Sequence, residues 1–150
     1  MACVVSSRPE ARGITRAETA GIPATATTDE DETAAFLDRH DVELVVLAGY
    51  MRILSPAFLS RFPGRIVNVH PSLLPAFPGR TAITDALAHG VRVTGVTVHI
   101  VEEQVDSGPI LKQEAVEVPY DGDAVELERR IHEVEHRLLP QAVREFGTPS

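Results

Sequence analysis

Two polar residues at the end of an apolar run, Asn68 and His70, are the first candidates for chemistry. They close the segment RIVNVH, residues 65–70, which reads as a strand. Side chains alternate along a strand, so these two share one side of it. A histidine there can serve as acid or base near neutral pH, and an asparagine amide can donate a hydrogen bond to an oxyanion. For an isolated pair, the plainer alternative is stronger: both side chains merely satisfy backbone groups of the next loop.

A carboxylate changes that balance. Asp106 lies in the sequence VDSGPI, and a buried carboxylate beside His70 would favour the protonated ring and fix its orientation. Taken alone, Asp106 in a D-S-G sequence is a typical turn residue. The segment HPSLLPAFPG, residues 70–79, has three prolines and two leucines, which predicts a stiff loop. A rigid loop directly after His70 favours a pocket wall over a structural corner.

The elements that must position these residues follow an α/β pattern, because short apolar runs alternate with helical periodicity. VELVVLAG, residues 42–49, is apolar on both faces and predicts a buried parallel strand. Asn68 and His70 then lie at the carboxyl end of a strand, where open α/β sheets bind ligands. We expect strands at residues 3–6, 22–27, 42–49, 65–70, 94–101 and 110–118. We expect helices at residues 8–20, from Thr28 or Asp29 to His40, at 55–62, 81–89 and 123–146, the last interrupted near Pro140.

The composition excludes several classes of function. The 150 residues fit one domain, and 43% hydrophobic with 24% charged residues is typical of a soluble globular chain. A net charge of -8 argues against a nucleic-acid surface. The single cysteine, Cys3, cannot form an internal disulfide, which fits a reducing cytoplasm. No leader opens the chain, no apolar run could cross a membrane, and His70, His89 and His99 lack the spacing of a helical metal site.

Four stretches together carry a family resemblance: LVVLAGYMRILSPAF, RIVNVHPSLLPAFPG, TVHIVEEQVDSGPIL and VEHRLLP. The chain resembles the phosphoribosylglycinamide formyltransferases of purine synthesis from about Val4 to its last helix. That resemblance implies an open, mostly parallel, Rossmann-like sheet with helices on both faces. Methionyl-tRNA formyltransferase and formyltetrahydrofolate hydrolase share the Asn-x-His and the distant Asp. The first carries a further C-terminal domain and the second an N-terminal regulatory domain, and neither is found here.

The resemblance also implies roles. Asn68, His70 and Asp106 would be catalytic, and Glu135 and Pro71 would meet the glycinamide substrate. A cis peptide bond would precede Pro75. The co-substrate would be 10-formyltetrahydrofolate, and no metal is needed. The folate pocket would comprise Met51, Arg52, Ile53, Leu54, Asn68 and the loop from Val101 to Asp106. From the residues alone, 51–54 could equally be an ordinary strand-to-helix connection.

The front of the chain departs from the family, which opens with a strand, a Gly-rich phosphate loop and a helix. This chain begins at what resembles the second strand, and Gly13 and Gly21 do not replace the loop. We therefore expect one formyltransferase domain over residues 1–150, incomplete at the N-terminus, and weak grip on a ribonucleotide phosphate. For the sheet we expect a gap, re-paired strands, or a partner that supplies a strand, including self-association through the exposed sheet. The residues after Gly79, Arg80 to Ile83, also depart from the family, with no expected effect on the catalytic three.

The predicted function is formyl transfer from 10-formyltetrahydrofolate to the amine of glycinamide ribonucleotide, with activity that truncation would impair. One alternative is a remnant that binds folate without catalysis. Another is a different formyl-folate enzyme, such as formyltetrahydrofolate hydrolase. The expected partners are these small molecules, with no nucleic acid and no membrane, and the expected location is the cytoplasm.

Overall fold

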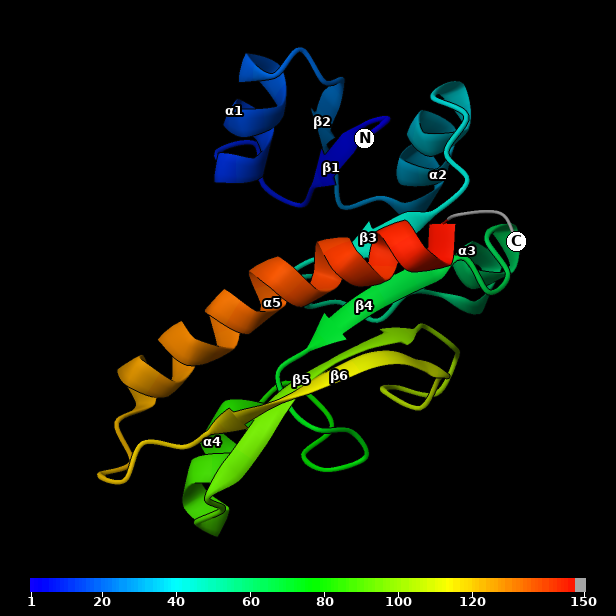
Figure 1. Cartoon of the computed structure of the whole chain (residues 1–150). Coiled ribbons are helices and arrows are strands. Elements are labelled where there is room, and N and C mark those ends of the chain that lie inside the picture. The colour runs from blue at the N-terminus through cyan, green and yellow to red at the C-terminus, as the bar shows by residue number, and fades with distance from the viewer. Residues whose placement is uncertain (148–150) are drawn as a thin grey trace. The chain divides into compact units, whose positions relative to one another are not determined.

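The computed structural model describes residues 1–147 and confirms the α/β class. The chain divides into two compact units, Met1–Glu43 and Leu44–Ser150. Their strands form two separate sheets, one with the order β1-β2 and one with the order β3-β4-β5-β6 (Figure 1). The described strands thus form two sheets, and a gap, re-paired strands and a strand from a partner all stay predictions.

The first unit is a small β-α-β-α arrangement. It consists of β1 (Val4–Ser6), α1 (Arg12–Thr19), β2 (Ala24–Ala26) and α2 (Glu30–Arg39), and the two strands pair in parallel. Asp29 caps α2 by accepting a hydrogen bond from the Glu32 amide at 2.9 Å, as its side chain predicts. The first helix begins at Arg12 rather than Arg8. Pro9 disfavours helical geometry at the residue before it, so the chain makes a turn there first.

The second unit is a four-stranded sheet with a long covering helix. Its order of elements is β3 (Val45–Leu47), α3 (Pro56–Arg61), β4 (Ile66–His70), α4 (Ala82–His89), β5 (Val93–Ile100), β6 (Ile110–Glu117) and α5 (Ala124–Gly147). β3 and β4 are parallel, whereas β4, β5 and β6 pair antiparallel. α5 packs along β4, β5 and β6 (Figure 1).

The core of this unit lies between β5 and α5. Val96, Val98, Leu127 and Ile131 are all fully buried there. Burying each such side chain stabilises the fold by roughly 1.5–3 kcal/mol relative to exposure. The apolar side chains of β5 thus anchor the strand that runs beside Asn68 and His70.

The strand predicted at residues 42–49 needs correction. Only Val45–Leu47 is a strand, and it is not fully buried, because Val46 is 40% exposed. Within the described residues β3 is hydrogen-bonded on one side only, to β4. An apolar pattern predicts burial on both faces, but an edge position in the sheet leaves a strand partly in solvent.

The predicted interruption near Pro140 is wrong. α5 continues from Ala124 to Gly147 with Pro140 inside it. A proline in a helix interior removes one backbone hydrogen bond and costs about 3 kcal/mol. Leu138 and Ala142, two residues before and after it, are buried in the core and hold both halves of the helix against the sheet. Between residues 1 and 147, no helix combines the length and the apolar character that a membrane span requires.

Candidate active site

The register of the sheet gathers four polar side chains on one side. Asn68 lies opposite His99 of the antiparallel neighbour β5, and His70 lies opposite Thr97. Residues directly opposite in an antiparallel pair point to the same face, as do residues two apart in one strand. Because β4 ends at His70 and Leu47 at the end of β3 pairs with Asn68, these side chains lie at the carboxyl ends of β3 and β4.

His70 and Asp106 form a buried pair of ionisable side chains. His70 Nδ1 lies 3.5 Å from Asp106 Oδ2, and the two side chains are only 6% and 9% exposed. The other ring nitrogen, Nε2, lies 2.9 Å from the carbonyl oxygen of Phe77. A carbonyl can only accept, so Nε2 carries the proton of that hydrogen bond. Both ring nitrogens therefore face oxygen acceptors, and a proton on Nδ1 would meet the carboxylate.

The loop at residues 101–109 delivers Asp106 to this position. The Ile100 amide donates to the Pro109 carbonyl at 2.9 Å and closes the base of the loop. Asp106 has a φ of 54°, in the left-handed region that aspartate tolerates better than most residues. Gly108 packs so tightly that an added Cβ would lie 1.9 Å from the Ile100 carbonyl oxygen. The tight turn that positions the Asp106 carboxylate therefore requires a glycine at position 108.

His99 belongs to the same cluster, although it was not among the site residues expected from the sequence. Its Nε2 lies 3.7 Å from Asp106 Oδ1 and 3.4 Å from the Asn68 amide nitrogen. Its Nδ1 donates to the Ile100 carbonyl at 2.9 Å, which fixes the ring. The available signal was a histidine inside an otherwise apolar strand, TVHIV, but the register that sets it against Asn68 is a tertiary feature. We call Asn68, His70, His99 and Asp106 the polar centre.

Glu135, predicted to meet the substrate, lies on α5 within the electrostatic reach of the polar centre. Its side chain is 18% exposed, and burial raises its pKa above the usual range. The histidines His132, His136 and His70 act in the opposite direction, with His132 Nε2 at 4.0 Å from Glu135 Oε2. The structure therefore brings Glu135 near His70, although the two are far apart in the sequence.

The predicted folate residues form a mostly exposed rim, defined here as residues 51–54. Met51 and Ile53 are 63% and 70% exposed, Arg52 is also exposed, and Leu54 is buried. The rim follows β3, whose Leu47 pairs with Asn68, so it leaves the sheet at the same end as His70. Of the other predicted residues, Val101 and Pro71 are half-buried, each beside a strand end.

The loop after His70 has the geometry that the resemblance implied. The peptide bond between Leu74 and Pro75 is cis, which confirms that expectation. Phe77, whose carbonyl meets His70, has a φ of 48°. At its end, the Gly79 amide donates to Asp106 Oδ2 at 2.8 Å. This loop and the Asp106 loop are therefore joined directly at the polar centre.

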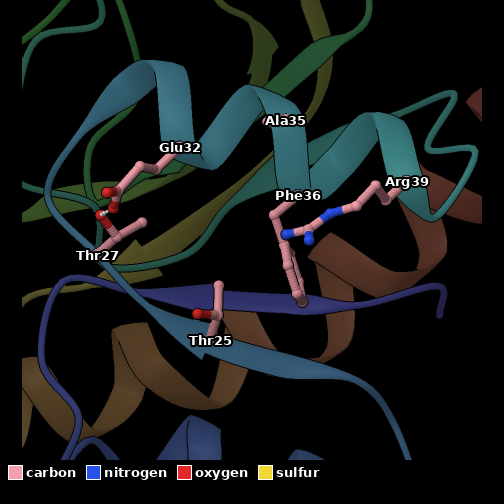
Figure 2. A pocket seen from close by; sticks show the side chains of 6 residues that line it. All are labelled: Thr25, Thr27, Glu32, Ala35, Phe36 and Arg39. Carbon is pink, nitrogen blue, oxygen red and sulfur yellow. Dashed lines mark hydrogen bonds between the residues drawn. The ribbon is translucent and has the colours of Figure 1, made fainter.

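A separate cavity of about 460 Å³ lies within the first unit. Figure 2 shows its lining, in which Thr27 bonds to Glu32 at 2.5 Å and the Arg39 guanidinium stands 5.5 Å from the centre of the Phe36 ring. None of the predicted site residues lines it. Over the described part of the chain, no group of three metal-ligating side chains could hold a metal ion.

A buried histidine–carboxylate pair beside an amide donor, at the carboxyl end of a strand in an α/β sheet, has the groups that acid–base chemistry and stabilisation of an oxyanion need. The particular family follows from comparison with known proteins. The sequence profile of the family described as formyl transferase matches residues 1–143, and the chain belongs to that family. The match spans both compact units.

The similar proteins include several phosphoribosylglycinamide formyltransferases. The one from Bacillus subtilis (strain 168) is 42% identical over 154 residues, which cover 97% of this chain and 79% of the relative. The one from Mycobacterium tuberculosis (strain H37Rv) is 57% identical over 110 residues, 73% of this chain and 51% of the relative. The crystal structure of the Streptococcus pneumoniae TIGR4 protein has a TM-score of 0.91 at 40% identity and covers 99% of this chain and 87% of that one.

One structural neighbour has a different activity in its name. The formyltetrahydrofolate deformylase from Pseudomonas syringae has a TM-score of 0.88 at 31% identity, and the match covers 96% of this chain and 50% of that one. It is a more distant neighbour than the three formyltransferases above, and the alternative of a hydrolase is correspondingly weaker.

Proposed function

We propose that this chain transfers the formyl group of 10-formyltetrahydrofolate to the amine of glycinamide ribonucleotide in purine biosynthesis. The observation that carries the proposal is the buried approach of His70 to Asp106, 3.5 Å apart, beside the Asn68 amide. The formyl transferase match and the names of the relatives supply the reaction class and the acceptor. The match over residues 1–143 supports treating the chain as one formyltransferase domain.

The reaction needs an oxyanion to be stabilised and a proton to be moved. The amine nitrogen attacks the formyl carbon, so a C–N bond forms and the carbonyl oxygen becomes negative. The bond from that carbon to N10 of the folate then breaks. The proton lost by the amine passes to N10, directly or through water, so that atoms and charges balance without any metal or redox step.

Asn68 and His70 would hold the oxyanion. The Asn68 amide nitrogen has two hydrogens, and the contact with His99 uses one of them, which leaves one for the developing charge. The Nε2 proton of His70 is shared with the neutral carbonyl of Phe77. A negatively charged oxygen is the stronger acceptor and can compete for that proton. Asp106 holds the His70 ring and stabilises positive charge on it, and His99 orients the Asn68 amide by accepting one of its hydrogens.

The remaining predicted residues would bind the two substrates. The exposed apolar side chains of Met51 and Ile53 suit the face of a flat ring, and Leu54 anchors the rim in the core. Arg52 and the loop from Val101 to Asp106 supply polar groups around that ring. Glu135 would meet the acceptor amine, while Pro71 lies directly after His70 where that substrate would pass.

The test is an assay of the purified chain with both substrates, in which formyl transfer and formate release are measured separately. Transfer that requires the ribonucleotide supports the proposal. Formate release without an acceptor would favour the hydrolase. Calorimetry with each substrate alone distinguishes a third outcome. A chain that binds folate, but neither binds the ribonucleotide nor turns over, would be a non-catalytic remnant, and this result would overturn the proposal.

The setting of the reaction also remains a proposal. Purine synthesis from soluble small molecules fits a cytoplasmic location, as the single free cysteine suggests. Self-association through the exposed edge of β3 stays a prediction.

A further inference from the structure

A buried hydroxyl fastens the first half of the loop at residues 71–79. Thr97, on β5, is fully buried. Its Oγ1 donates to the Ser72 carbonyl at 2.7 Å and accepts from the Leu74 amide at 3.1 Å. Gln113, on β6, donates to the same Oγ1 at 3.0 Å and to the Leu74 carbonyl at 2.9 Å. Two strands therefore hold three backbone groups of one short loop segment.

Every hydrogen-bonding position in this contact is used. A hydroxyl has one hydrogen and two lone pairs, and Thr97 donates once and accepts twice. The Gln113 amide nitrogen has two hydrogens, which go to Thr97 and Leu74. Removing either side chain leaves backbone groups without a protein partner. At Thr97 those groups are buried, which is costly, whereas Gln113 is exposed, so that water can replace part of what its amide supplies.

The second half of the loop ends on the reacting residues. Ser72 Oγ bonds to the Ala76 carbonyl at 2.5 Å, and the next carbonyl, Phe77, meets His70 Nε2 at 2.9 Å. Gly79 then donates to Asp106. The loop is thus fixed by Thr97 and Gln113 at its start and by His70 and Asp106 at its end. Phe77 is only three positions after Leu74, so a shift of the backbone at Leu74 would displace the Phe77 carbonyl as well.

We propose that Thr97 and Gln113 are positioning residues, which together set the loop so that the Phe77 carbonyl holds the His70 ring for catalysis. They touch no reacting atom and act through Ser72 and Leu74. The proposal rests on the proposed function for its catalytic readout, but its structural readout is independent of that function.

The chain contains a matched control on the same strand. Thr94 is also buried on β5, at 2% exposure, but within the described residues its hydroxyl has no hydrogen-bond partner. Thr97→Val and Thr94→Val make the same chemical change at two buried sites of one strand. We expect Thr97→Val to lower kcat by between about fivefold and a hundredfold, and Thr94→Val to leave it unchanged. Thr97→Ser, which keeps the hydroxyl, should restore most of the loss.

A second variant covers the case in which Thr97→Val does not fold. Gln113→Glu places an oxygen-only group beside the Leu74 carbonyl, and an ionised carboxylate there would repel it. The activity of Gln113→Glu should therefore fall below that of the unaltered chain at neutral pH. Gln141→Glu, the same change on α5, should leave the activity unchanged.

Nuclear magnetic resonance separates the proposal from the proposed function. Thr97→Val or Gln113→Glu should speed hydrogen exchange at the Leu74 amide and shift the His70 ring resonances, whether or not the chain transfers formyl groups. If the two variants exchange faster but the unaltered chain transfers no formyl group, the proposed function is wrong and the positioning role stands. Unchanged His70 resonances in both variants, or equal loss of kcat in Thr94→Val and Thr97→Val, would overturn the positioning role.

Discussion

The polar centre and the rim at residues 51–54 are built in opposite ways. In the polar centre, His70, His99 and Asp106 are buried and each contacts at least two other groups. In the rim, Met51 and Ile53 are largely exposed. The contacts of the centre are already made within the chain, as the proposed stabilisation of a developing charge would require. The rim would instead gain burial if the proposed folate ring covered it. We therefore expect variants of the centre to change kcat and variants of the rim to change KM.

The largest effect should come from Asp106→Asn. It removes the charge beside His70 but keeps an oxygen that can accept from Gly79, so the loop should survive. We expect kcat to fall by about 10²–10⁴ with a near-normal melting temperature, measured by transfer assay and circular dichroism. Asp41→Asn is the control, since Asp41 has a similar φ of 51° and lies in the first unit. Near-normal turnover in Asp106→Asn would break the assignment of the catalytic three.

His99→Leu should have the next largest effect. It takes away the hydrogen-bond partner of the Asn68 amide without touching His70. Leaving a part-buried donor without its partner costs about 1–3 kcal/mol, so kcat should fall by about fivefold to a hundredfold. His40→Leu, at the end of α2, serves as the control. If His99→Leu changed only the KM for the folate, His99 would belong with the rim and not with the polar centre.

A rim variant, Ile53→Ser, should act on binding alone. Ile53 is 70% exposed, so the free protein loses little when its side chain is truncated. Burial of an apolar side chain under a ligand contributes on the order of 1–2 kcal/mol, which corresponds to a rise of about fivefold to thirtyfold in the KM for the folate. Val125→Ser, at an equally exposed position on α5, should change neither constant. A fall in kcat for Ile53→Ser would remove the distinction between the two regions.

The smallest effect on activity should come from Glu135→Gln, which tests the border between the two regions. Burial raises the pKa of Glu135 in the folded chain. The protonated form is therefore favoured by folding, and its contribution to stability is present at low pH and lost as the pH rises through the raised pKa. Glu135→Gln should melt at a higher temperature than the unaltered chain at pH 8, with no difference near pH 4. Its KM for the amine substrate should rise by about tenfold.

A reversed result for Glu135→Gln would be equally informative. Lower stability of the variant at pH 8 would mean that the attraction of His132, His136 and His70 outweighs the cost of burial. Thermal melts across the pH range, read beside the kinetic constants, distinguish the two cases.

The strands β3 and β5 show why part of the fold could not be predicted. Both read as apolar runs, and residues 42–49 looked the more buried of the two. In the structure β5 is buried along almost its whole length, because β4 and β6 flank it and α5 covers it. β3 has a neighbour on one side within the described residues, and Val46 is partly exposed. Hydrophobic pattern reports what a strand can bury, whereas its place in the sheet decides what it does bury.

The predicted bounds of three helices agree with the structure where neighbouring side chains set them. Ser55 and Asp29 cap the helices that follow them, and Gly90 ends α4 in the left-handed conformation. The helix through Pro140 was misjudged because its continuity depends on burial of Leu138 and Ala142 in a distant core.

The sequence by itself determined the α/β class and the strand that ends in Asn68 and His70, since residue types and their periodicity carry that information. The choice of Asp106 as a site residue came from the family resemblance of its motif. Only the tertiary structure decided that His99 lies near both Asn68 and Asp106. It also decided that Thr97 and Gln113 hydrogen-bond to the loop and that Glu135 interacts electrostatically with His70. These contacts join β4, β5, β6 and α5 across long stretches of chain. Strand register and helix packing create them, and neither is written in any one segment of the sequence.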